Sequence, residues 1–253
     1  MTTVLRVGDH TLTAEEIIPL LAGYQLLPSL LREIIIDKAI STINCTPEEK
    51  ASATGQFFEQ NQITDKAAQQ AWALRYGMTT TQLEALATRG LLVEKFKQAT
   101  WGHKLESYFL KVKGQLDRVI YSLIRTQDVG VAQELYFRIQ EGEQSFSELA
   151  REYSQGPEAQ TGGLIGPVEL STPHPALAQM LRLGQPGQIF PPIRLGEWVV
   201  IVRLEKFIPA QLDDSMRKRL LNDCFTTWLS EQLNQQLAVT NYGVDEPDRA
   251  GNP

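Results

Sequence analysis

The chain is poor in the residues that build metal sites and disulfide frameworks. Its 253 residues include two cysteines, Cys45 and Cys224, and three histidines, His10, His103 and His174, all far apart in the sequence. A disulfide framework needs more cysteines, and a zinc site needs clustered Cys or His. The sequence therefore predicts no metal site and no disulfide, and this weakly favours a reducing compartment.

An excess of basic charge and long apolar runs are also absent. Lys plus Arg number 24 against 30 for Asp plus Glu, a net charge of -6, which argues against a dedicated nucleic-acid binder or an electrostatic membrane-surface protein. The most apolar stretch, residues 17–40, contains charged residues and prolines, so no transmembrane span is predicted. No secretory signal is recognised at the start, so the expected location is the cytoplasm.

Several classes of enzyme lack support as well. No nucleophile–base set, metal cluster or nucleotide-binding loop stands out, which disfavours a hydrolase or an oxidoreductase and predicts no cofactor. Apolar residues make up 42% of the chain and charged residues 21%, as in an ordinary globular protein. The length allows one large domain or two modest ones.

The pattern along the chain predicts an α+β protein in four segments. Residues 1–116 read as helices, with capping-box patterns and a break expected at Gly90 and Gly102. Residues 117–207 mix strands and helices. Residues 208–240 carry one amphipathic helix whose broad apolar stripe needs a partner, so it is expected to dock on the first segment. Residues 241–253, rich in Pro, Gly, Asp and Asn, are expected to be a disordered tail.

The 117–207 segment resembles the parvulin family of peptidyl-prolyl isomerases. The resemblance rests on several motifs in the family's order and spacing: Phe146–Ser154, Gly162–Gly166, Leu183–Gln188, Pro191–Ile193 and Gly196. The whole chain looks like a SurA/PrsA-type protein. This implies a helical, chaperone-like domain, closed by the returning last helix, with an inserted parvulin-like module of the FKBP-like superfold.

The resemblance also points to a site, but the residues there depart from the family's pattern. The family's two histidines and its Cys or Asp fall at Tyr121, Trp198 and Gly156. We take these as the positions aligned with the catalytic network and name no confident catalytic residue. The resemblance further implies a set of peptide-binding positions: Tyr121, Leu123, Ser154, Ile165, Thr172, Ala176, Phe190 and Trp198.

These replacements have a physical consequence for catalysis. Rotation of a prolyl peptide bond faces a barrier of about 18–20 kcal/mol, and an isomerase must bind the twisted amide better than the planar one. Tyr121 and Trp198 each keep a donor but lose the paired imidazoles, and Gly156 has no side chain. We expect isomerisation to be weak or absent, while an apolar groove could still hold a peptide.

Simpler interpretations stay open for individual residues. In these interpretations, Tyr121 and Trp198 only fill space in the core, and Ser154 only caps its loop. Gly162 and Gly163 can serve a turn that requires positive φ.

Three hypotheses for function follow. The first is a parvulin-like chaperone or escort for a polypeptide client, with little or no isomerase activity. The second is an active isomerase with an altered site. The third is a cytosolic adaptor that holds a precursor peptide for an exporter or a modifying enzyme. The sequence gives no indication of an oligomeric state.

Overall fold

The computed structural model of the chain describes residues 3–239, so the tail expected at residues 241–253 lies outside the described residues. The chain divides into two compact units. The first joins the residues up to Leu105 to those from Arg217 onward, and the second spans Glu106–Met216. The segment boundaries expected from the sequence differ from this division, because helix α6 (Leu105–Leu116) falls almost entirely in the second unit.

The first unit is built mainly of helices. A small antiparallel hairpin of β1 (Thr3–Val7) and β2 (His10–Thr13) precedes them. The helices of this unit are α1 (Ala14–Gly23), α2 (Leu27–Ile40), α3 (Pro47–Gln60), α4 (Lys66–Arg75), α5 (Thr80–Trp101), the short η1 (Gly102–Lys104) and α10 (Asp214–Val239).

Two details of α5 differ from the sequence-based expectation. The pattern Thr81-x-x-Glu84 predicts a capping box at Thr81, but the helix is capped two residues earlier by Thr79, whose backbone N–H donates to Gln82. It also runs unbroken through Gly90 and ends only at Gly102. A glycine inside a helix costs about 1 kcal/mol relative to alanine, and a long packed helix tolerates that cost.

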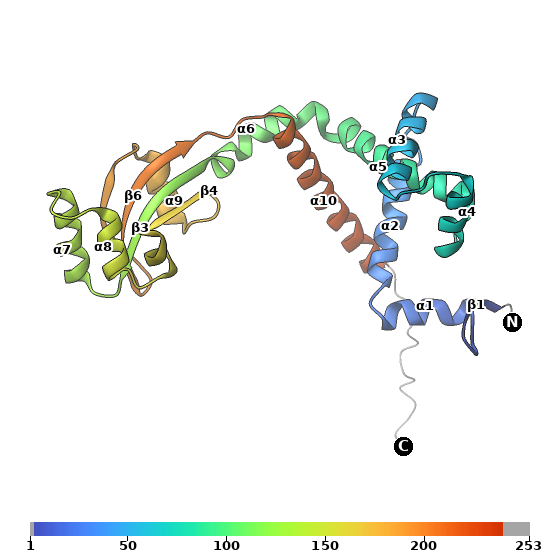
Figure 1. Ribbon diagram of the computed structural model, residues 1–253, viewed down its shortest axis with the longest axis horizontal. Helices are drawn as coiled ribbons and strands as arrows, with labels where there is room; N and C mark the ends of the chain where they lie inside the picture. Colours follow the sequence, from blue (N-terminus) through green and yellow to red (C-terminus); the bar gives the residue numbers. More distant parts are fainter. Residues whose placement is uncertain (1–2, 240–253) are drawn as a thin grey trace, which may run out of the picture. The chain divides into compact units, whose positions relative to one another are not determined.

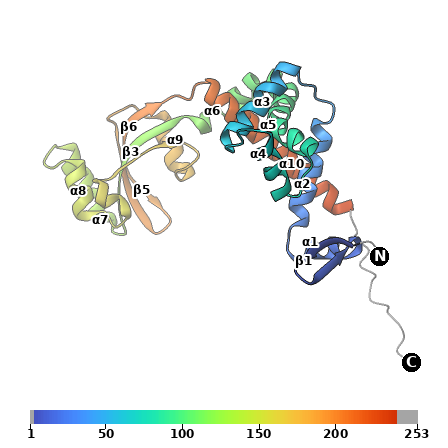
Figure 2. The same cartoon turned by 45° about the vertical axis from the view of Figure 1, so that its right-hand side comes forward.

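An aromatic cluster joins α10 to the other helices of the first unit. Phe96 and Trp101 of α5 stack edge-on or tilted against Phe225 and Trp228 of α10, with ring centroids 5.2–6.3 Å apart. Ile36 and Ile40 of α2 complete the buried cluster, and α10 lies beside these helices in Figure 1 and in Figure 2. The amphipathic stripe of the last helix is therefore covered by α2 and α5.

The buried Lys97 adds a polar contact to this cluster. Its Nζ donates to Glu94 and to Asn222 of α10, at 2.6 Å each, and lies 5.0 Å from the Phe225 ring centroid. Lys97 is only 6% exposed, and a buried charge is costly unless it is paired and hydrogen-bonded. Glu94 and Asn222 supply these partners.

The second unit is an antiparallel sheet with helices on both faces. Its strands, in the order β4-β3-β6-β5, are β4 (Leu164–Glu169), β3 (Arg118–Thr126), β6 (Trp198–Ile208) and β5 (Ile189–Leu195). The helices are α7 (Val129–Gln140), α8 (Phe146–Tyr153), the short η2 (Pro157–Thr161) and α9 (Pro175–Leu183). The α+β class expected from the sequence is confirmed.

Alternation along the strands divides the core into two layers. Tyr121 and Leu123 of β3 pack with α9, whereas Ile124 of β3 and Ile201 of β6 pack with α7 and α8. Figure 1 shows α7 and α8 together on one side of this sheet and α9 on the other. We call these surfaces the α9 face and the α7 face of the sheet.

Helix length and hydropathy also bear on membrane insertion. Within residues 3–239, no helix is long and apolar enough to span a bilayer.

We expect Phe225→Ala to destabilise the first unit by about 3–5 kcal/mol, because it removes the ring at the centre of the aromatic cluster. Fluorine NMR of protein labelled with 5-fluorotryptophan would follow urea unfolding at Trp101 and Trp228. The matched control is Thr227→Ala, an exposed position of the same helix. Equal unfolding midpoints for the two variants would contradict the role of the cluster.

Candidate functional site

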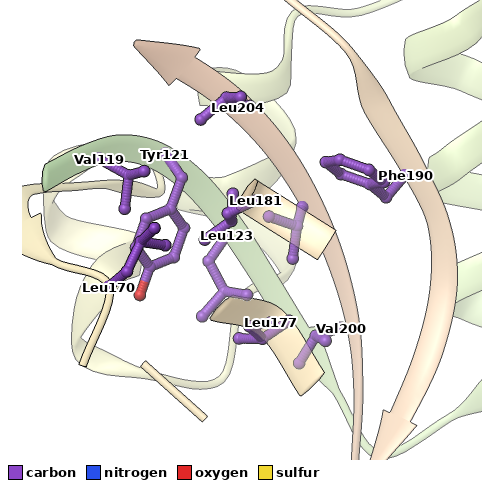
Figure 3. Packing of buried hydrophobic residues seen from close by; sticks show 10 residues of the cluster. Val119, Tyr121, Leu123, Leu170, Leu177, Leu181, Phe190, Val200 and Leu204 are labelled. Atoms are coloured by element: carbon purple, nitrogen blue, oxygen red, sulfur yellow. The ribbon is translucent and has the colours of Figure 1, made fainter. Parts of the chain in front are cut away.

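Tyr121, the position aligned with the family's first histidine, is a core residue. It lies on β3, is only 6% exposed and belongs to the buried cluster of the α9 face. Figure 3 shows its ring beside Leu170 and Val119. Burial raises the pKa of its hydroxyl, with opposing smaller effects from the charges of Arg125 and Glu158. Tyr121 is therefore a neutral phenol that fills space in this core.

The other predicted peptide-binding residues fall into two groups. Leu123 and Phe190 are buried in the same cluster as Tyr121, and Ile165 and Trp198 are partly buried against it. Ser154, Thr172 and Ala176 lie outside this cluster, on the loop after α8, the loop before α9 and the first turn of α9. The structure brings five of the eight residues together, while their contact with a peptide stays a prediction.

A polar network that the sequence analysis missed lies between β3 and the loop after α8. Arg125 donates from Nε and Nη2 to the two carboxylate oxygens of Glu158, at 2.7 and 2.6 Å. The Ser154 hydroxyl donates to the same carboxylate at 2.6 Å and accepts from the Arg125 backbone N–H. The side chain of Glu158 is 2% exposed and that of Arg125 is 29% exposed. The pair is thus a bidentate ion pair with its acid buried.

The charges of this pair are fixed. Burial alone would raise the pKa of Glu158, but the hydrogen bonds from Arg125 and Ser154 outweigh it and hold the pKa below its usual range. The hydrogen bond to Glu158 likewise raises the pKa of Arg125. Neither group exchanges a proton near neutral pH, so neither can act as a general acid or base there.

The ion pair occupies the space that a side chain at position 156 would need. A Cβ built on Gly156 would stand 2.6 Å from one carboxylate oxygen of Glu158, and closer still to the other oxygen and to Arg125 Nε. The φ angle of Gly156 is -123°, which any residue adopts. The backbone would thus allow any residue at position 156, but a side chain there would displace the ends of Arg125 and Glu158.

Trp198 stands at the start of β6, next to this network. The Arg125 guanidinium carbon lies 5.9 Å from its ring centroid. Because residues 198, 200 and 202 alternate with Val199 and Ile201, Trp198 belongs to the α9 face with Tyr121. Gly156 and Trp198 thus lie beside the Arg125–Glu158 ion pair. None of the three positions Tyr121, Gly156 and Trp198 supplies an imidazole or a thiol.

Two signals in the sequence could have revealed the network. Arg125 stands four residues after Tyr121 on one strand, so both side chains share a face. Glu158 stands two residues after Gly156, in a loop that must return toward that strand. A carboxylate and a guanidinium near an aligned catalytic position are candidates for pairing.

Comparisons with known proteins agree with this fold. Residues 126–206 match the family model described as the rotamase, PPIC-type PPIase domain. We call the part of the chain that is similar to this model the rotamase domain. The match confirms the resemblance to parvulin-type isomerases for this part of the chain. A comparison with curated proteins found no match.

Solved structures extend the likeness over both units. The peptidylprolyl isomerase PrsA from Bacillus cereus is 15% identical, with 98% of this chain and 95% of that chain covered, at a TM-score of 0.51. PrsA from Bacillus anthracis is 18% identical over 83% and 97% of the chains, at a TM-score of 0.45. The parvulin domain of PpiD from E. coli is 29% identical over 40% and 97%, at a TM-score of 0.34. The first match supports a shared fold across the chain.

We expect Gly156→Ala to destabilise the rotamase domain by about 1–3 kcal/mol, because the new methyl group collides with the ion pair. The same substitution should cost less in a Glu158→Ala background, where the carboxylate has been removed. Urea unfolding followed at fluorine-labelled Trp198 would measure this double-mutant cycle. Strictly additive effects of the two substitutions would show that the ion pair does not occupy the space at position 156.

We also expect the contribution of Glu158 to stability to depend on pH. Its pKa is lower in the folded domain than in the unfolded chain, where a glutamate titrates near pH 4.3. The contribution is therefore complete above about pH 5 and is lost as the pH falls through the folded pKa. Unfolding between pH 3 and 7 should show wild type and Glu158→Gln converging toward low pH. In the control Glu134→Gln, a surface position, little difference is expected at any pH.

Proposed function

We propose that the chain is a polypeptide-binding chaperone or escort in which the rotamase domain contributes little or no isomerisation. The observation that carries this proposal is the Arg125–Glu158 pair in the space beside Gly156. Groups of fixed charge and a buried phenol stand where the family has titratable side chains. The fold has been kept, while the network that distinguishes twisted from planar amides has been replaced.

The energetic argument is one of differential binding. Each tenfold of rate requires about 1.4 kcal/mol of stabilisation that is realised only in the transition state. Such stabilisation comes from donors aimed at the position where charge develops. Arg125 already donates from Nε and Nη2 to Glu158, and the Tyr121 side chain lies in the core. We infer that little of this stabilisation remains available to a bound prolyl peptide.

Exposed apolar side chains in the first unit support polypeptide binding. Leu26, the N-cap residue of α2, and Leu30 and Ile34 within the helix stand four residues apart and are 38–52% exposed. Residues at this spacing share one face of a helix, so they form a continuous apolar stripe. Contiguous exposed apolar surface is typical of interaction sites. An unfolded client offers the apolar side chains that such a stripe would cover.

A groove of about 630 Å³ between α3 and α5 provides a second surface in the same unit. Apolar and polar side chains both line it: Phe57, Leu86, Leu91, Ser52, Gln56, Gln60, Glu49 and Glu94. Both acids already have lysine partners, Lys95 and Lys97, at 2.6 Å. The groove therefore offers apolar contacts and uncharged hydrogen-bonding groups to a client.

We expect the protein to suppress aggregation of an unfolded client without accelerating prolyl exchange. Exchange NMR on Ala-Glu-Pro-Phe, Ala-Leu-Pro-Phe and Ala-Lys-Pro-Phe should give rates with protein within about twofold of the uncatalysed exchange, which takes tens to hundreds of seconds. Light scattering of a thermally unfolding client would measure chaperone activity. Efficient exchange that is lost in Trp198→Ala would favour the active-isomerase hypothesis instead.

The double variant Leu30→Ser with Ile34→Ser tests the apolar stripe. Both residues are exposed, so the fold is expected to tolerate the change while client protection falls severalfold. Leu74→Ser is the matched control, because Leu74 is 81% exposed on α4 and is not part of the stripe. Client protection that is equal in all three proteins would exclude the stripe as a client surface.

A further inference from the structure

An apolar groove with a cation at its wall lies on the α7 face of the rotamase domain, away from the aligned site. It encloses about 490 Å³ between α7 and the β5–β6 hairpin. Val199 of β6 lines it, and Val199 faces away from its neighbour Trp198 because successive strand residues alternate. None of the eight predicted peptide-binding residues lines this groove. It is a surface separate from the site considered above.

The helix side of the groove is apolar and accessible. Val129, Gln133, Tyr136 and Phe137 of α7 recur at spacings of three and four residues and share one face of the helix. Val129 is 46% exposed and Phe137 is 58% exposed. Val129 and Phe137 are thus exposed to solvent on the α7 face, where the groove lies.

The strand side supplies a guanidinium with no acidic partner. Arg194 of β5 lies directly opposite Val199 in the strand register, so the two side chains share the α7 face. Its Nε donates to the Gly196 carbonyl at 3.3 Å. Among the described residues, no carboxylate lies within ion-pair distance of Arg194. The acid preceding the groove, Asp128, is engaged as the cap of α7.

The edge strand restricts how an occupant can bind. β5 is one of the two outer strands of the sheet, and Pro191 and Pro192 line the groove. Proline has no backbone N–H, so at these two positions the edge lacks donors for an added strand. An occupant must therefore bind mainly through its side chains. Extended proline-containing segments do so, because their backbone makes no hydrogen-bond ladder and they dock on aromatic-lined grooves.

We propose that this groove binds an extended, proline-containing peptide segment in which apolar residues are followed by acidic ones. The apolar side chains would cover Val129, Tyr136 and Phe137, and the carboxylate would pair with Arg194. The proposal is independent of the proposed function, because it concerns the opposite face of the sheet.

The test uses the full chain and a pair of synthetic peptides. The probe is acetyl-Ser-Pro-Leu-Pro-Phe-Asp-Asp-Gly-amide, and its comparison peptide has two asparagines in place of the aspartates. Calorimetric titration and chemical-shift mapping on labelled protein would measure affinity and location. We expect saturable binding of the acidic peptide, shifts at α7 and β5, and affinity at least about tenfold weaker for the asparagine peptide.

Matched variants make the assignment specific. Arg194→Gln should weaken the acidic peptide about tenfold and leave the asparagine peptide unchanged. Arg118→Gln is the control, since Arg118 is also exposed and donates a 3.3 Å hydrogen bond to a backbone carbonyl. Phe137→Ser should weaken both peptides, whereas Leu183→Ser, at a residue 77% exposed on α9, should weaken neither.

Several outcomes would overturn the proposal. These are the absence of saturable binding, equal affinity for the two peptides, insensitivity to Arg194→Gln, or shifts centred on Trp198 and the α9 face. Failure of client protection with intact binding of the acidic peptide would count against the proposed function alone.

Discussion

The Arg125–Glu158 ion pair determines what the rest of the aligned site can contain. A buried carboxylate needs a full set of partners, and Arg125 and Ser154 supply them. With the pair in this position, a side chain at position 156 would require the ends of Arg125 and Glu158 to move. A side chain at position 156 and the ion pair would compete for the same volume. The residue type at position 156 is therefore linked to the position of the Glu158 carboxylate.

Much of the fold could be predicted from local signals. The capping box at Thr46 opens α3, and the apolar pattern of residues 175–183 matches α9. Strand β5 was not predicted, because Pro191 and Pro192 weaken the strand signal and an edge position tolerates them. The break expected at Gly90 was wrong, because packing of a long helix outweighs the cost of one glycine.

The site was predicted less completely than the fold. Alignment of motifs pointed to Tyr121, Gly156 and Trp198. It could not predict how buried their side chains are, because burial depends on contacts with residues outside the motifs. Tyr121 and Phe190, expected to face a peptide, lie in the core. The partner of Arg125 is 33 residues away in sequence, so no local pattern links them. The loss of the usual network stays a prediction from the sequence, and the structure adds the ion pair that lies beside Gly156.

Strand alternation gives the β5–β6 hairpin two different surfaces. Trp198 faces α9 beside the ion pair, while the next residue, Val199, faces α7 with Arg194 opposite. A shift of the register by one residue would exchange these surfaces, so the register between β5 and β6 fixes both. The ion pair neutralises the charge on the α9 face, whereas Arg194 on the α7 face has no acid to neutralise it among the described residues. The hairpin therefore places Trp198 beside a neutralised ion pair on one face and Arg194 on the other, without any residue serving both.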